Sequence, residues 1–219
     1  MARKYNYNDN YFENIDTEEK AYWLGFIAAD GSIVNNNRAL EISLKQSDRN
    51  HLVKFANAIG ETERMIKDRN QKCSNGKYYA TSRITVCSPI LINHLSRYGI
   101  VQNKGLNLNF PTFLNDDLLR HYLRGYFDGD GSISTNGKYR NGSPKYALNL
   151  IATKSFLEDF MTHLETLEIT KIKLQTKNKM SVWNKVGINQ IRIILSYLYD
   201  NCTTYLDRKY VYARELLPS

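Results

Sequence analysis

The amino-acid sequence predicts an α+β protein in which two similar halves each follow the order helix, strand, strand, helix, strand, strand, helix, giving two antiparallel sheets. The first observation is an internal repeat, because the segment at residues 21–33 returns at residues 122–133. The second is the constant spacing of the matches: five motif residues recur 100 positions later, and four later residues are matched 105 positions on, namely Gly25, Asp30, Gly31, Ser32 and Ile33, then Leu52, Phe55, Ile59 and Lys104. A persistent offset indicates duplication. We expect halves at residues 1–108 and 109–219, joined near 103–115.

The elements of the first half have clear local signals. A helix begins near residues 16–19, where a capping residue precedes two acidic residues. A strand pair turns at residues 35–38, and its second strand, 40–45, alternates apolar and polar residues. A second helix begins at Asp48. Strands at 61–69 and 78–87 and a third helix, begun by Ser88 and Pro89, complete the half.

The second half is predicted by the same order. We expect strands at 145–151, a helix at 155–167, strands at 169–177 and 186–194, and helices beyond. The motif segment opens this half as a helix, as it does the first.

Charge narrows the range of partners. The 219 residues include 30 Lys and Arg against 22 Asp and Glu, a net charge of +8. A basic compact protein favours nucleic acid as a partner, with a membrane surface as the second choice. No apolar run approaches the ~18 residues of a membrane span, and the first residues lack the apolar core of a signal peptide.

Cysteine and histidine usage excludes several kinds of site. The three cysteines are widely spaced, which predicts reduced thiols in an intracellular compartment rather than disulfides or a zinc site. The four histidines are also scattered, so any bound metal is expected to have oxygen ligands.

The two motif segments are apolar on nearly every face, which predicts buried helices. Each carries small residues four positions apart, a spacing that allows two helix backbones to approach closely. We therefore expect the two helices to pack on each other about a pseudo-two-fold axis through these positions: Gly25, Ala29, Gly125 and Gly129.

This packing would bring Asp30 and Asp130 together at the ends of the two helices, each followed by a glycine suited to a helix C-terminus. A carboxylate at the negative end of a helix dipole is unfavourable, and two adjacent ones repel. A divalent cation held by aspartate and backbone carbonyl oxygens would compensate, and such ligands suit Mg²⁺. The pair beside a basic surface indicates metal-assisted phosphodiester hydrolysis. A calcium loop is excluded, since Tyr126 and Gly137 occupy its acidic positions.

Residues 23–31 and 123–131 resemble the LAGLIDADG motif of homing endonucleases, and the repeat order is similar to the two-repeat, monomeric branch of that family. Arg124 and Gly129 depart from the motif in the second copy, and Ala28 does so in the first. The resemblance implies an αββαββα half folded twice, with the motif helices at the interface and the two sheets forming a DNA-binding saddle. It also implies metal-dependent double-strand cleavage at a long asymmetric DNA site, in the context of intron homing.

The resemblance assigns roles to named residues. Mg²⁺ would be shared by Asp30 and Asp130, with Ala29 and Gly129 as further ligands. Mn²⁺ is expected to substitute, and Ca²⁺ to support DNA binding without cleavage. By the same resemblance, Lys104 and Lys209 would act as charge stabilisers near the active sites. Two further candidates would position water because they directly follow the first strand pair, namely Lys45 and Gln46. The last two align at offset 105 with Leu150 and Ile151, which predicts unequal active sites.

The predicted strands independently favour DNA binding. Several of them place basic and amide or hydroxyl side chains on one face, a combination that suits phosphate and base-edge contacts. The candidates are Arg38, Glu41, Ser43, Lys45, Tyr79, Thr81, Arg83, Thr85, Lys138, Arg140, Lys145, Asn149, Lys171, Lys173, Gln175, Lys177, Gln190 and Arg192.

Two alternatives use the same scaffold: an RNA-binding maturase that assists folding of its host intron RNA, and a non-catalytic DNA-binding regulator. The intact aspartates in both copies favour the nuclease. The chain ends carry no intein splice-junction residues, so we expect a free-standing monomeric enzyme that acts on double-stranded DNA without a membrane or an obligate protein partner.

Overall fold

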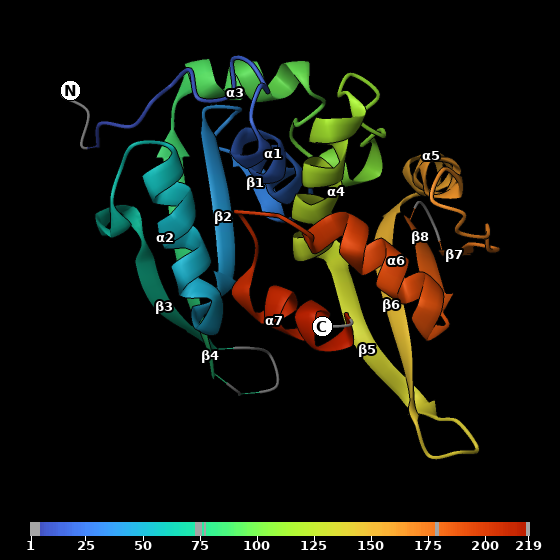
Figure 1. Cartoon of the computed structure of the whole chain (residues 1–219). Helices are drawn as coiled ribbons and strands as arrows, with labels where there is room; N and C mark the ends of the chain where they lie inside the picture. The colour runs from blue at the N-terminus through green and yellow to red at the C-terminus, as the bar shows by residue number, and fades with distance from the viewer. Residues whose placement is uncertain (1–4, 73–75, 77, 178–179, 218–219) are drawn as a thin grey trace.

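The computed structural model describes residues 5–72, 76, 78–177 and 180–217, and these form two halves with the same order of elements, the second followed by one further helix (Figure 1). The first half consists of α1 (Glu18–Asp30), β1 (Gly31–Val34), β2 (Ala39–Lys45), α2 (Arg49–Ala58), β3 (Lys67–Lys72), β4 (Tyr78–Cys87) and α3 (Pro89–Arg97). The second consists of α4 (Asp116–Asp130), β5 (Gly131–Lys138), β6 (Pro144–Thr153), α5 (Lys154–Glu165), β7 (Gln175–Lys177), β8 (Met180–Val186), α6 (Ile188–Tyr199) and α7 (Asp207–Leu216). Single 3-10 turns add η1 (Gln46–Asp48), η2 (Glu63–Met65) and η3 (Lys104–Leu106).

The strands form two antiparallel sheets with matching topology, β1-β2-β4-β3 and β5-β6-β8-β7. Figure 1 shows α1 and α4 side by side in the middle of the molecule, with one sheet on either side. The fold class expected from the repeat is therefore confirmed.

The motif helices meet through their small residues. A Cβ on Gly125 would lie 2.8 Å from the backbone nitrogen of Phe26 and would overlap the carbonyl oxygen of Tyr22. A Cβ on Gly129 would likewise overlap that of Ala29. Side chains larger than these would force the two backbones apart, so the four-residue spacing of small residues fixes the pseudo-two-fold interface.

Helix starts follow the capping signals of the sequence. The Thr17 hydroxyl accepts from the backbone N–H of Lys20 at 3.3 Å, and the Ser88 hydroxyl accepts from Leu91 at 3.1 Å with Pro89 in the first turn. In the second half, the Asn115 side chain accepts from Leu118 at 2.9 Å. Each side chain satisfies a helix N–H that would otherwise have no partner.

Each sheet has one covered and one open face. On β2, the apolar residues Leu40, Ile42 and Leu44 point into the core, while Ser43 and Lys45 are exposed. Helices α2 and α3 contact the first sheet, and α5 and α6 contact the second. The open faces remain accessible to a partner.

The predicted strands at 169–177 and 186–194 are wrong in their bounds. The structure has β7 at Gln175–Lys177 and β8 at Met180–Val186, and residues 188–199 form α6. The β-branched run in this segment suggested a strand, but the buried residues have helical spacing: Ile191, Ile194, Leu195 and Leu198. Gly187, with φ of +100°, separates strand from helix.

The C-terminal helix α7 lies against the first half. The Lys54 ammonium on α2 pairs with Asp207 at 2.5 Å, and the Arg208 guanidinium pairs with Asp48 at 2.9 Å. Across the described residues, no helix is long and apolar enough to cross a membrane.

Candidate metal centre and nucleic-acid interface

Asp30 and Asp130 are the last residues of α1 and α4, and each directly precedes the first strand of its half. The close packing of the two helices brings the Asp30 carboxylate against α4. A Cβ on Gly129 would lie 3.4 Å from both Cγ and Oδ2 of Asp30. The aspartates therefore belong to one site, as the repeat predicts.

The glycines that follow the aspartates serve a different purpose from the one expected. Gly31 and Gly131 have φ of −75° and −85°, which is extended backbone and not the left-handed helix end that favours glycine. A Cβ on Gly31 would lie 2.7 Å from the carbonyl oxygen of Ile27, and one on Gly131 would lie 2.5 Å from that of Phe127. Absence of a side chain, not backbone freedom, lets the chain turn directly from helix into strand.

Two buried lysines donate hydrogen bonds to carbonyl oxygens at the C-terminal ends of the motif helices. The Lys209 ammonium donates to the carbonyl oxygens of Phe127 at 2.6 Å, Asp128 at 2.7 Å and Gly131 at 2.5 Å. The Lys104 ammonium donates to Gly31 and, at 3.4 Å, to Ala29. Both lysines therefore offset the negative charge at the C-terminal ends of α1 and α4, to which Asp30 and Asp130 add their own.

Burial and mutual repulsion make the carboxylates hard to ionise. Burial, and after it the neighbouring Asp130, together raise the pKa of Asp30 to about 6 against the opposing effect of the two lysines. Burial also raises the pKa of the Asp130 carboxyl, although part of that residue remains exposed, and the two lysines oppose the shift. A site that resists two negative charges favours a bound cation.

The pKa values of the two lysines shift in the opposite direction, downward. Burial lowers the pKa of Lys209 to about 8 and also lowers the pKa of Lys104, while both aspartates oppose each change. The two carboxylates and the two ammonium groups therefore influence one another's charge, and burial disfavours the charged form of each.

The donor set fits a divalent cation with oxygen ligands. Two carboxylates meet at one place, and the described residues contain no cluster of three or more His, Cys, Asp or Glu that could hold a metal by itself. The remaining ligands would have to be backbone carbonyls, water or substrate phosphate, as is common for Mg²⁺. The Ala29 carbonyl, one predicted ligand, already accepts weakly from Lys104, and Gly129 lies beside Asp30.

Lys45 and Gln46 are exposed at the end of β2 and in η1. The strand register pairs Gly31 with Ile42 and Gly131 with Leu150, so Lys45 corresponds to Thr153 instead of Leu150. The expected counterparts were therefore three residues out of register, because η1 inserts residues 46–48 in the first half only. The water-positioning role of Lys45 and Gln46 stays a prediction.

Most of the DNA-contact candidates lie on the open sheet faces or in the turns beside them. The strand residues that alternate with the core positions are Glu41, Ser43, Lys45, Tyr79, Thr81, Arg83, Thr85, Lys145 and Asn149. The exposed residues at the strand ends and turns are Arg38, Lys138, Arg140 and Gln175. Arg83 is already paired, since its guanidinium contacts Glu41 at 3.1 Å.

Several candidates lie elsewhere. Gln190 and Arg192 are on α6, where the Arg192 guanidinium donates to the carbonyl oxygen of Leu216 at 2.7 Å. Lys171 and Lys173 precede β7 outside any strand, and Lys171 pairs with Glu165 at 2.8 Å. Strand alternation therefore does not place these four on the sheet face. The Lys177 side chain lies outside the described residues.

Sequence reasoning missed two groups near the site. The Tyr126 hydroxyl donates to the carbonyl oxygen of Ile151 at 3.2 Å, and Tyr126 also lowers the pKa of the Asp130 carboxyl, whereas the first copy has Phe26 at that position. Asn184 on β8 donates to Asn149 across the open sheet face. The tyrosine was visible as a motif difference, but Asn184 was hidden by the misplaced strand.

The comparisons with known proteins agree with this geometry. The LAGLIDADG-like domain model matches residues 17–101 and 117–206. The chain therefore belongs to the LAGLIDADG family, with one match in each half.

Solved structures share the fold. The LAGLIDADG meganuclease I-CpaMI, bound to uncleaved DNA, has a TM-score of 0.57 at 13% identity, covering 89% of each chain. The homing endonuclease I-GzeII, in complex with its DNA target, has a TM-score of 0.57 at 12% identity, covering 90% of this chain and 88% of the other. I-SmaMI, bound to uncleaved DNA in the presence of calcium ions, has a TM-score of 0.53 at 12% identity, covering 89% of each chain.

Two curated relatives come from Methanocaldococcus jannaschii. The DNA-directed RNA polymerase subunit Rpo1C is 24% identical over 161 residues, and the replication factor C small subunit is 28% identical over 196 residues. The matches cover 72% and 88% of this chain but only 17% and 10% of the relatives. The chain thus matches a short segment of each.

Proposed function

We propose that the protein is a site-specific homing endonuclease that makes metal-dependent double-strand breaks at a long asymmetric DNA site. The observation that carries the proposal is the placement of Asp30 and Asp130 at one helix interface, with a buried lysine at each helix end. Membership of the LAGLIDADG family and the DNA-bound state of its solved relatives support DNA as the partner.

The two carboxylates of the site would place a cation where it can assist phosphodiester hydrolysis. Asp30 and Asp130 would hold Mg²⁺, or Mn²⁺ in its place, with the backbone at Ala29 and Gly129 nearby. When bound, the cation would polarise the scissile phosphate and favour attack by water. The two carboxylates would hold the cation between the two halves, so one interface would serve both DNA strands.

The two lysines contribute fixed positive charge. A lysine ammonium has three donors, and all three of Lys209 are directed at carbonyl oxygens. It can therefore stabilise negative charge on a phosphate through the local field without shuttling a proton. Lys104 directs two donors at carbonyl oxygens, which leaves one for a phosphate oxygen.

The open sheet faces would bind the DNA, with basic residues on the phosphates and amide side chains on base edges. The free thiols of Cys87 and Cys202 suit the reducing intracellular compartment that we infer.

The test uses the aspartates and a library of plasmid targets incubated with the protein and Mg²⁺, followed by sequencing of broken ends. Asp30→Asn and Asp130→Asn remove charge while keeping size, so each is expected to abolish double-strand cutting and retain DNA binding. Mn²⁺ should support cutting. Ca²⁺ should support binding alone, because it is larger and tolerates a looser ligand geometry.

A matched control is Asp16→Asn, which removes a carboxylate from the exposed ion pair with Lys20 at the other end of α1. It is expected to cut like the unchanged protein. Full cutting by either active-site variant, or DNA binding without any cutting by the unchanged protein in Mg²⁺, would contradict the proposal, and the latter would favour a regulator.

A further inference from the structure

At two buried positions the second motif copy has a charged residue where the first has an apolar one. Leu24 and Ala28 of α1 correspond to Arg124 and Asp128 of α4, and the two polar residues are 0% and 1% exposed. Buried charged groups are costly unless they are paired and hydrogen-bonded. Their partners therefore indicate what the second half gains from them.

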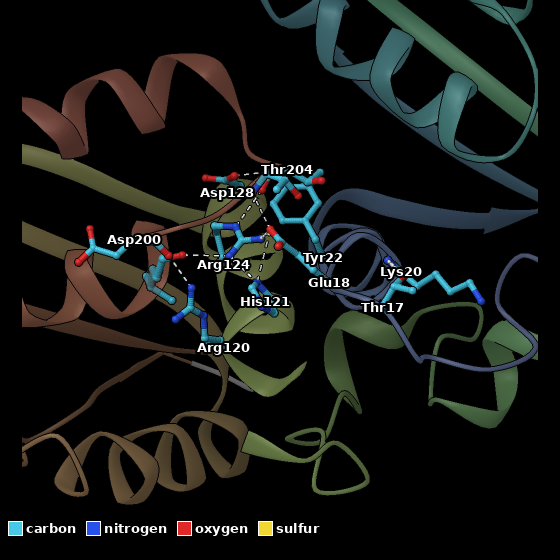
Figure 2. A network of polar contacts seen from close by, with 12 residues as sticks. Thr17, Glu18, Lys20, Tyr22, Arg120, His121, Arg124, Asp128, Asp200 and Thr204 are labelled. Atoms are coloured by element: carbon cyan, nitrogen blue, oxygen red, sulfur yellow. Dashed lines mark hydrogen bonds and ion pairs between the residues drawn. The ribbon is translucent and has the colours of Figure 1, made fainter. Parts of the chain in front are cut away.

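Arg124 binds the segment that leads from α6 to α7 (Figure 2). Its guanidinium donates to the carbonyl oxygen of Leu198 at 3.1 Å and to that of Thr204 at 2.8 Å. It also pairs with Glu18 on α1 at 2.8 Å, and Glu18 in turn accepts from the backbone N–H of Thr203 at 2.7 Å. The arginine and the glutamate together hold both ends of this segment to the two motif helices.

Asp128 holds the residue that precedes α7. Its carboxylate accepts from the Leu206 backbone N–H at 2.8 Å, from the Tyr22 hydroxyl at 2.7 Å and from the Tyr199 hydroxyl at 2.6 Å. Leu206 is the N-cap of α7, and no side chain caps the helix there. Asp128 therefore fixes the point at which α7 begins.

The start of α7 determines where Lys209 lies. The Leu206 carbonyl accepts from the backbone N–H of Lys209 at 3.0 Å, in the first turn of the helix. The Lys209 ammonium then donates back to the carbonyl oxygens of Phe127 and Asp128. In the first half, Lys104 lies on the short turn η3, and the corresponding Leu24 and Ala28 have no polar side chain to hold that segment.

The structure assigns Arg124 and Asp128 a positioning role: they hold the α6–α7 segment so that Lys209 lies fixed beside Asp130, a device absent from the first half. This assignment rests on the proposed function only for its effect on catalysis. With this positioning role, the active site that contains Lys209 depends on Asp128, whereas the active site that contains Lys104 does not.

The deciding experiment measures the reactivity of lysines in the full chain by pulsed amine labelling and mass spectrometry. Lys209 and Lys104 are both buried, at 4% and 8% exposure, so Lys104 serves as an internal reference. In Asp128→Ala, the residue type of the first copy, we expect the Lys209-to-Lys104 labelling ratio to rise at least about threefold through local opening of α7. An unchanged ratio overturns the assignment.

Two variants separate positioning from general loss of stability. Asp128→Asn keeps an oxygen that accepts from the Leu206 N–H, so its Lys209-to-Lys104 labelling ratio should stay close to that of the unchanged protein. Ile194→Ala removes a buried side chain from α6 without touching the network, and should leave the ratio unchanged. If Asp128→Ala does not fold, Glu18→Ala, at a half-buried position, should raise the ratio to a smaller extent, and no rise there overturns the assignment.

The effect on catalysis is measured as the cleavage rate of each DNA strand, with the two strands labelled separately. Asp128→Ala should slow the same strand or strands as Lys209→Ala, and should add nothing in the Lys209→Ala background, because one acts through the other. A different strand pattern, or additive losses, overturns the assignment. If the unchanged protein cuts no DNA, the proposed function fails, whereas the labelling ratio still decides the positioning role.

Discussion

A Cβ on Gly25 would lie 2.8 Å from the carbonyl carbon of Tyr122 and would overlap its oxygen, so the backbones of α1 and α4 are in direct contact at this point. Neither partner can yield easily, because the obstructing atoms are backbone atoms inside a helix. The contact is repeated in the opposite sense by Gly125 and Tyr22. The relative placement of the two sheets and of the two aspartates depends on this pair of glycines.

Gly25→Ala is therefore expected to lower the free energy of unfolding by about 3 kcal/mol or more, at the upper end for overpacked cores. Chemical denaturation followed by circular dichroism measures the change. Gly105→Ala is the matched control, since its added Cβ meets no atom within 4 Å and its φ is not in the left-handed region. Equal stability of the two variants would contradict the tight interface.

The same interface predicts a monomer. The pseudo-two-fold surface that a symmetric dimer would provide is formed between α1 and α4 of one chain. Sedimentation equilibrium should give the mass of one chain at micromolar concentration, with or without DNA. A stable dimer, or preference for a perfectly palindromic target, would show that the internal interface is not sufficient.

The fold was predictable wherever residues signalled their own local structure. The caps at Thr17 and Ser88 and the alternation on β2 predicted elements that the structure confirms. The prediction was wrong near β8 because Lys185 occupies a core-facing position, where its ammonium donates to the carbonyl oxygen of Thr170 at 2.9 Å. A lysine in an inward position conceals the strand pattern.

The site was predictable as far as the repeat extended. The constant offset identified Lys104 and Lys209 as a matched pair, but their carbonyl partners depend on tertiary contacts that no spacing encodes. Arg124 was visible only as a departure from the motif, and Asp128 only as a motif residue that the first copy replaces with Ala28. Their partners on α1 and on the α6–α7 segment lie 71 to 106 positions away in the chain, beyond the reach of any local pattern.

His51 should make stability depend on pH. Its ring packs between Trp23 and Phe26, and burial lowers its pKa to about 3. The unfolded chain, with a pKa near 6.5 at this residue, binds more protons between pH 6.5 and 3, so the free energy of unfolding falls as pH drops through this range. The slope approaches about 1.4 kcal/mol per pH unit.

The measurement is the difference in unfolding free energy between the unchanged protein and His51→Gln across pH 5 to 7.5. Glutamine does not titrate, and its amide can donate to the Tyr22 hydroxyl, which contacts His51 Nε2 at 3.0 Å. Groups common to both proteins, including Asp30, cancel in the difference. We expect the advantage of the unchanged protein to shrink by about 2 kcal/mol between pH 7 and pH 5. A constant difference would mean that His51 titrates normally.

The open sheet faces should carry the salt-dependent part of DNA binding, and Lys145 tests this. Lys145 is exposed on β6, on the side of Asn149, whereas Arg192 lies on α6 and donates to the Leu216 carbonyl. Both carry one positive charge, so they form a matched pair that differs in place. Lys145→Ala should weaken binding to target and scrambled DNA alike and reduce the slope of log affinity against log salt by about one. Arg192→Ala should change neither. Titrations of both variants on both DNAs across a salt series measure the two slopes, and equal losses would show that the open faces are not the DNA-binding surface.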